Sequence, residues 1–219
     1  MTELARKQPL PDESRDRLTS VEFRYMCRLS RYEIQEDEPL QRWSVTYWGI
    51  DELTGAATQI GSLECWRAEI NRPDLCVALD AASGDLEEFT VVLNVMTGEL
   101  DVDRQEGWPS DVGLTGTIGL LIIKSSELVP EAEWRGYDLG SYLPLLAIRS
   151  FAASCNIVAT YPAPPGLGGS AREAGRRKLI AVAEVMAFTR HRDSDVWIMP
   201  LDALDLSAKM ELRAEELDL

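Results

Sequence analysis

The segment at residues 117–155 decides the fold of this chain. It reads TIGLLIIKSSELVPEAEWRGYDLGSYLPLLAIRSFAASC. Its continuous apolar run, 118–123, predicts that 117–129 is a strand buried on both faces, as in the middle of a sheet. Apolar side chains then recur near one face of a predicted helix over 138–155. A buried strand that leads directly into a long helix is typical of a mixed α/β sheet.

The sequence on both sides of this segment supplies the remaining predicted strands. Runs rich in aromatic and β-branched residues predict strands at 21–29, 43–50, 59–70, 157–161 and 195–199. The second and third of these are expected to form a hairpin, because turn-forming residues lie between them. The strand at 157–161 is expected to run parallel to the strand at 117–129 and to separate from it near Val129, which leaves a slot.

Predicted helices occupy 74–82, 85–96, 171–187 and 204–217. Asp85 is expected to cap the second of these, with acidic residues in its first turn, where they favour the helix dipole. Residues 99–113 and 166–170 are expected to be loops. The predicted fold class is therefore α/β, with a mixed central sheet flanked by helices on both faces.

The chain is expected to form one domain with extensions, because 219 residues is long for one small domain and short for two. The polar residues 1–19 are predicted to be a flexible leader. The domain spans 20–219, with an N-terminal half at 20–116, a second half at 117–200 and a C-terminal helical extension at 201–219.

The composition limits the partners that this protein is expected to bind. The formal net charge of −15 repels phosphate backbones and anionic lipid headgroups, so nucleic acids and membranes are not expected partners. The same charge keeps a protein soluble and attracts cations, including amines. No apolar run reaches the length of a membrane span and residues 1–17 lack a signal-peptide core, so a cytoplasmic location is expected.

The cysteines and the single histidine give no metal or disulfide pattern. Cys27, Cys65, Cys76 and Cys155 have no CxxC spacing and are expected to be reduced core residues. The only histidine is His191, which excludes a Cys2His2 zinc site. We therefore predict no metal site.

The loop that enters the long helix has the chemistry of an anion cradle. Residues 134–141 read WRGYDLGS. A helix N-terminus exposes unpaired N–H groups with partial positive charge, and Gly136 and Gly140 let the backbone approach a bulky anion closely. Arg135 adds a permanent cation with a planar fork of donors. Together these features favour binding of a pyrophosphate.

At these residues the chain resembles the GNAT superfamily of N-acyltransferases. The acyl-CoA loop of that family has the pattern Arg/Gln-x-x-Gly-x-Gly/Ala, and here Arg135 to Gly140 occupy it. The resemblance continues through the helix and the proline-ended strand at 157–164, and covers about 117–200. It implies a GNAT-like fold with acetyl-CoA or another acyl-CoA as co-substrate. The implied binding residues are Leu128, Val129, Arg135, Gly136, Tyr137, Asp138, Leu139, Gly140 and Ser141.

Two residues depart from the family pattern. Asp138 stands at the usual central glycine of the loop, where its carboxylate either caps the helix and competes with a phosphate, or points to solvent and leaves the cradle usable. Pro144 lies beyond the first turn of the helix, removes the donor to the Gly140 carbonyl and favours a kink.

The catalytic residues that the resemblance implies are also incomplete. Family members commonly use a glutamate on the central strand as base, and Glu127 is the best candidate here, against the alternative of a surface glutamate. They often protonate the thiolate with a tyrosine on the last helix, and Tyr161, in a neighbouring strand, is the candidate substitute, against the alternative of a packed aromatic.

Two functions follow from this pattern. The first is an N-acyltransferase that moves an acetyl or related acyl group from CoA to an amine, on a small molecule or a protein. The second is a catalytically inactive GNAT-like module that binds a ligand or partner, which the carboxylate of Asp138 favours. The sequence leaves a homodimer open.

Overall fold

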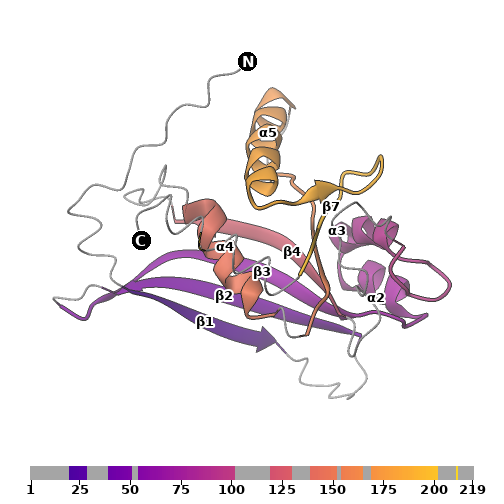
Figure 1. Cartoon of the computed structure of the whole chain (residues 1–219), viewed down its shortest axis with the longest axis horizontal. Helices are drawn as coiled ribbons and strands as arrows, with labels where there is room; N and C mark the ends of the chain where they lie inside the picture. Colours follow the sequence, from indigo (N-terminus) through magenta and orange to yellow (C-terminus); the bar gives the residue numbers. More distant parts are fainter. Residues whose placement is uncertain are drawn as a thin grey trace.

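The computed structural model describes residues 20–28, 39–50, 54–101, 119–129, 139–151, 154–164, 169–201 and 211. These form a seven-stranded mixed sheet with the strand order β1-β2-β3-β4-β5-β7-β6 (Figure 1). The predicted leader at 1–19, the loop residues 130–138 and all but Glu211 of the predicted helix at 204–217 lie outside the described residues.

The predicted strands are present with small shifts at their ends. They are β1 (Ser20–Arg28), β2 (Leu40–Ile50), β3 (Ala57–Glu69), β4 (Gly119–Leu128), β5 (Ile157–Thr160), β6 (Thr189–Arg190) and β7 (Trp197–Pro200). The expected hairpin of β2 with β3 is confirmed, because the two strands pair antiparallel. The two-residue β6 was not predicted, since a run this short gives no periodicity to read.

The strands β4 and β5 form the one parallel pair among the described strands. Their register joins Leu120 with Ile157 and ends at Ile123 with Thr160. The predicted parallel arrangement is therefore confirmed. Because β4 continues to Leu128, its second half extends beyond its pairing with β5.

A β-bulge lies where β4 leaves β5. On β3, Glu64 pairs with Ser125 and Cys65 pairs with Ile123, so Lys124 is the extra residue on β4. A bulge bends its strand and increases the local twist. The bend therefore falls one residue after Ile123, at the end of the parallel pairing.

Helices cover both faces of the sheet, as predicted. The elements α2 (Leu75–Ala82), α3 (Gly84–Glu87) and the 3₁₀ helix η1 (Glu88–Val92) pack on one face. The helices α4 (Leu139–Arg149) and α5 (Gly169–Val185) lie on the other face, where α5 projects away from the sheet (Figure 1). In the described part of the chain, no helix combines the length and the apolar character needed to cross a bilayer.

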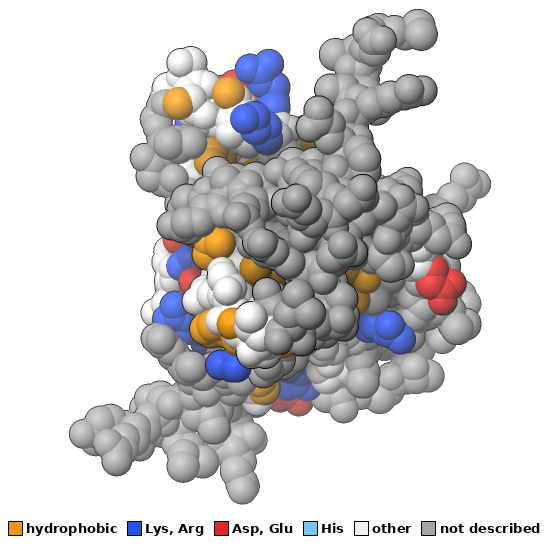
Figure 2. Space-filling view, turned by 90° about the vertical axis from the view of Figure 1, so that its left-hand side faces the viewer, with side chains coloured by type: hydrophobic (Ala, Val, Ile, Leu, Met, Phe, Trp, Pro, Cys, Tyr) orange, Lys and Arg blue, Asp and Glu red, His pale blue; other side chains and the backbone are white. Residues whose placement is uncertain are grey.

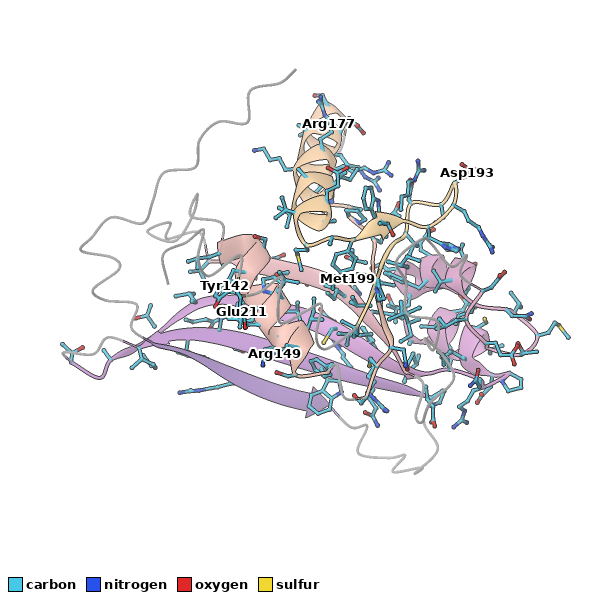
Figure 3. The ribbon with its side chains drawn as sticks, in the orientation of Figure 1. Tyr142, Arg149, Arg177, Asp193, Met199 and Glu211 are labelled. Atoms are coloured by element: carbon cyan, nitrogen blue, oxygen red, sulfur yellow. The ribbon has the colours of Figure 1, made fainter. Side chains whose placement is uncertain are left out.

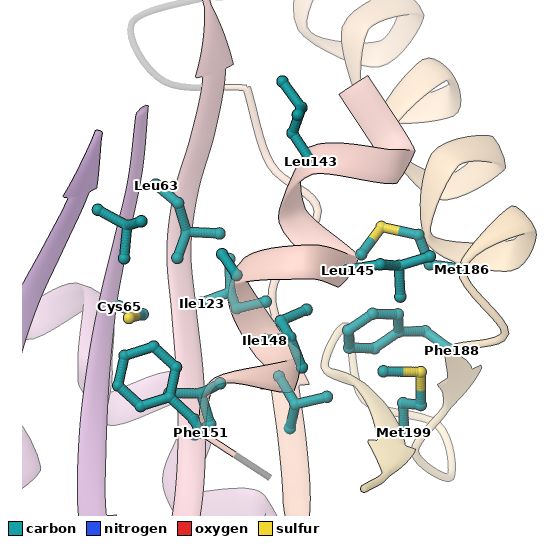
Figure 4. Packing of buried hydrophobic residues seen from close by; sticks show 14 of the residues in the cluster. Leu63, Cys65, Ile123, Leu143, Leu145, Ile148, Phe151, Met186, Phe188 and Met199 are labelled. Carbon is teal, nitrogen blue, oxygen red and sulfur yellow. The ribbon is translucent and has the colours of Figure 1, made fainter. Parts of the chain in front are cut away.

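Two hydrophobic clusters hold these layers together. On the α4 face, Leu63, Cys65 and Ile123 of the sheet meet buried residues of α4, and Met186 and Phe188 close the cluster (Figure 4). On the α2 face, Leu120 and Ile122 pack with apolar residues of α2, α3 and η1. The apolar residues of β4 thus contribute to both clusters, which agrees with the prediction of a strand buried on both faces.

The predicted helix at 85–96 is wrong in its start and its end. Ser83, not Asp85, precedes the first helical residue, and its side chain makes no capping hydrogen bond. The helix passes into the 3₁₀ helix η1, which ends at Val92. It stops there because the Asn94 side chain accepts hydrogen bonds from the N–H groups of Met96 and Thr97, which form a turn instead.

The predicted helix at 138–155 is also too long. It ends at Arg149, and the chain then closes with hydrogen bonds from the Ser150 and Phe151 N–H groups to carbonyls three residues earlier. This turn places the Phe151 ring against Trp43, with the ring centroids 5.6 Å apart. In contrast, α5 begins at Gly169, two residues before the predicted start.

Candidate functional site

The separation of β4 from β5 opens a cleft on the α4 and α5 side of the sheet. Its volume is about 550 Å³. Residues 123–127 of β4 and 160–164 after β5 line two of its walls, and Gly140 and Pro144 of α4 line a third. The fourth wall is the apolar side of α5, with Leu179, Val182 and Ala183. The slot that the sequence predicted near Val129 therefore begins slightly earlier, at the Lys124 bulge.

Gly140 leaves room in this cleft that packing does not require. A Cβ atom built on Gly140 meets only Leu128 Cδ1, at 3.9 Å, which is an ordinary contact. Glycine near the start of a helix is less favourable than alanine, and neither crowding nor an unusual backbone angle requires it here. A ligand that approaches this backbone closely would explain why residue 140 is a glycine.

Pro144 adds a second feature to the same wall of the cleft. It is buried, and it has no N–H to donate to the carbonyl of Gly140 one turn earlier. The helix continues to Arg149 despite this loss. Both departures from an ideal helix thus face the cleft.

The backbone of β4 presents hydrogen-bonding groups toward the opening. The Val129 N–H donates to the Ile60 carbonyl at 3.0 Å, within the pairing of β4 with β3. Val129, one of the predicted binding residues, therefore uses its N–H within the sheet. N–H groups alternate between the two edges of an antiparallel strand, so those of Leu128 and Ser126 face away from β3, toward the side that β5 has left.

A second cavity lies on the opposite face of the sheet, beside α3 and η1. Its volume is about 520 Å³. Four carboxylates line it, together with two cations: Glu64, Asp85, Glu88 and Glu127, with Lys124 and Arg172. It shares Lys124, Ser125, Glu127, Tyr161 and residues 163–164 with the cleft, so the two spaces meet where the strands part.

Ion pairs neutralise part of this charge. Lys124 Nζ lies 3.4 Å from Asp85 Oδ2 and 3.5 Å from Ser83 Oγ. Arg42 Nη2 lies 2.6 Å from Glu64 Oε1. This ion pair lines a smaller adjoining cavity of about 310 Å³, which Glu127 also lines. Within the described part of the chain, Glu88 and Glu127 make no ion pair.

The two predicted catalytic residues lie at the junction of the cavities. Glu127 is exposed and lines all three, and Tyr161 is partly buried and lines the two larger ones. Tyr161 also packs against the cluster on the α2 face. The fold thus brings together two residues that are 34 positions apart in the sequence.

The predicted cofactor-binding residues are placed less uniformly. Gly140 lines the cleft, whereas the side chains of Leu139 and Ser141 are buried in the protein. Leu128 packs against the core cluster on the α4 face. Arg135, Gly136, Tyr137 and Asp138 lie outside the described residues, so their role stays a prediction.

The other reactive side chains lie away from these cavities. Burial raises the pKa of the Cys65 thiol to about 12 and also raises the pKa of Cys155, so both thiols stay protonated near neutral pH. His191 is buried, and its Nε2 lies 3.1 Å from the Val91 carbonyl oxygen. Neither thiol nor His191 lines the cleft or the cavities beside it.

Sequence reasoning missed Lys124 and the α5 residues of the cleft. Lys124 is the first charge after the apolar run of β4, which marks the point where the strand leaves the core. The α5 residues Gly175, Lys178, Leu179 and Val182 have the spacing of one helix face, a signal that was present in the sequence.

Comparison with known proteins finds no family model, no curated protein and no solved structure that matches this chain. Among the described residues, no group of three or more histidine, cysteine, aspartate or glutamate side chains is placed to hold a metal ion.

Proposed function

We propose that this protein is a GNAT-like N-acyltransferase that moves an acetyl or related acyl group from CoA to an amine. The observation that carries the proposal is the cleft of about 550 Å³ at the point where β4 and β5 part. Its largely apolar walls suit a pantetheine arm, and the N–H groups of Leu128 and Ser126 on the edge of β4 point away from β3, toward this arm.

The first turn of α4 supports the placement of the cofactor. Gly140 lines the cleft, and the GNAT-like loop pattern ends at this residue. A thioester with its pyrophosphate at the start of α4 would direct its pantetheine arm along β4. The reacting carbonyl would then reach the junction where Glu127 and Tyr161 lie.

The proposed reaction is attack of a neutral amine on the thioester carbonyl. The new C–N bond forms as the C–S bond breaks, through a tetrahedral intermediate whose oxyanion the N–H groups of Leu128 or Ser126 stabilise. Glu127 takes the proton of the amine, directly or through water. Tyr161 donates a proton to the departing CoA thiolate. Placement of the two reactants supplies much of the rate enhancement.

The acceptor is proposed to enter through the cavity on the opposite face. A small-molecule amine fits a volume of about 520 Å³. The excess of carboxylates over cations there favours an acceptor that carries a positive charge.

An acceptor panel tests this preference. Release of the CoA thiol should be fastest with amines that carry a second cationic group and slowest with amines that carry a carboxylate. Higher ionic strength should raise KM and leave kcat nearly unchanged, because screening weakens capture and not the chemical step. Faster turnover of an anionic acceptor would contradict the assignment of this cavity.

A substitution at Asp138 separates the enzyme from the inactive module. In the sequence, Asp138 directly precedes Leu139, the first residue of α4. Its carboxylate and a pyrophosphate would compete for the same few N–H groups. We expect Asp138→Gly to bind acetyl-CoA more tightly in calorimetry, with a stability loss of only a few tenths of a kcal/mol in thermal melting.

The control for this experiment is Arg135→Ala, which should weaken binding in the parent and in Asp138→Gly alike. Unchanged affinity in Asp138→Gly, with a parent that binds well, would mean that the carboxylate does not compete. Absence of binding in every variant would favour the inactive module.

A further inference from the structure

The distribution of unpaired cations points to one wall of the cleft. Six of the described arginine and lysine side chains pair with a carboxylate, as Arg42, Arg72 and Lys124 do. Within the described part of the chain, Arg67 of β3 and Arg149 of α4 make no ion pair, and neither do three cations of α5. These three are Arg172, Arg177 and Lys178. This concentration of positive charge is unusual in a chain with a net charge of −15.

These cations lie on the part of α5 that is least involved in packing. Ala183 is the only buried residue of the helix as described, so the core holds α5 mainly by its C-terminal end. The other end projects from the molecule, with lysine and arginine side chains at its surface (Figure 2). Packing therefore gives no reason for the cations there.

Lys178 alone among these three cations faces the cleft. The α5 residues that line the cleft follow the spacing of one helix face, and Lys178 belongs to this series with Gly175 and Val182. Arg177, in the middle of the helix, lies outside this series and lines none of the described cavities (Figure 3). Arg172 instead lines the second cavity, beside Tyr161 and residues 163–164.

Lys178 lies on the wall opposite the start of α4. Gly140 and Lys178 line the same cleft from different helices. The proposed cofactor carries two separate anionic groups, a pyrophosphate and a 3′-phosphate on its ribose. If the start of α4 holds the pyrophosphate, an unpaired ammonium across the cleft is placed for the second group.

We infer that Lys178 binds the 3′-phosphate of the cofactor and makes the protein select CoA over nucleotides that lack this phosphate. The inference rests on the proposed function, because it concerns the same cleft. The ammonium acts as a point charge, which suits a terminal phosphate. A negatively charged protein needs such a local cation to capture an anion of this charge.

The experiment compares CoA with 3′-dephospho-CoA by calorimetry, in the full chain and in Lys178→Gln. The parent should bind CoA about fivefold more tightly than dephospho-CoA, the size expected for one exposed ion pair. Lys178→Gln should bind both nucleotides equally, with the affinity of the parent for dephospho-CoA. The matched control Arg177→Gln removes the neighbouring charge outside the cleft and should keep the preference.

The possible results separate the inference from the proposed function. If the parent binds both nucleotides with equal affinity, or Lys178→Gln keeps the preference, the inference is wrong and the acyl-CoA cleft stands. If Arg177→Gln loses the preference as fully as Lys178→Gln, the preference comes from the total positive charge of α5. The assigned contact between Lys178 and the 3′-phosphate is then wrong. If the parent binds neither nucleotide, both the inference and the proposed function fail.

Discussion

Replacing Gly140 by leucine should abolish acetyl-CoA binding while the protein stays folded. Gly140 lines the cleft, and a Cβ atom there meets only Leu128 Cδ1, at 3.9 Å. The larger side chain therefore has space in the empty cleft and fills the position proposed for the cofactor. We expect no detectable binding in calorimetry, with a melting temperature close to that of the parent.

The alanine variant at the same position should separate stability from binding. Gly140→Ala replaces a helical glycine, which should stabilise the protein by up to about 1 kcal/mol. It should also weaken binding, though less than leucine, because one methyl group already obstructs close approach to the backbone. Equal binding of acetyl-CoA by the parent, the alanine variant and the leucine variant would show that the cofactor does not contact this wall of the cleft.

Gly84 supplies the matched control for the leucine substitution. It lies at the start of α3 and lines the cavity on the opposite face, and a Cβ atom there meets nothing within 4 Å. Gly84→Leu should leave acetyl-CoA affinity unchanged and raise KM for the amine. If Gly84→Leu instead blocks acetyl-CoA, the two cavities have been assigned to the wrong substrates.

Replacing Glu127 by glutamine should lower kcat by about a hundredfold or more, the usual effect of removing a general base. Glu127 lines both the cleft and the cavity on the opposite face, so it lies where the amine and the thioester would meet. Glutamine keeps the shape and polarity of the side chain but cannot take a proton. Acetyl-CoA affinity should stay within about twofold, because Glu127 is not assigned to the cofactor.

Glu184→Gln is the control for the lost charge. Glu184 is exposed on α5 and lines none of the described cavities. Its replacement should leave kcat and KM unchanged. Full activity in Glu127→Gln would show that this carboxylate is only a surface residue, and a loss confined to KM would assign it to binding of the amine.

The sequence predicted the part of the fold that depends on burial patterns. The apolar run of β4 indicated a central strand, and its parallel pairing with β5 followed from the intervening helix. Periodicity could not reveal the Lys124 bulge, because a bulge depends on the register with β3. The early end of η1 depends on a hydrogen bond that the Asn94 side chain accepts from the Met96 N–H, which competes locally with the helix.

The sequence predicted the site residues that belong to one local motif, but not those that distant segments bring together in the fold. Glu127 and Gly140 were chosen because they belong to the strand and helix of one motif. The cavity on the opposite face combines residues from β3, α3, η1, β4 and α5, and no local sequence pattern links these residues. The sequence shows that Lys178 shares a helix face with Gly175 and Val182, but the position of that face in the cleft depends on how α5 packs beside α4.

Titration of the full chain with acetyl-CoA by calorimetry tests the central claim most directly, because it requires no knowledge of the acceptor. We predict binding at one site per chain with a Kd of about 1–100 µM, within the range usual for enzyme substrates. Gly140→Leu should show no binding under the same conditions. The absence of heat from the parent up to about 1 mM acetyl-CoA, or equal binding by Gly140→Leu, would contradict the assignment of the cleft to an acyl-CoA.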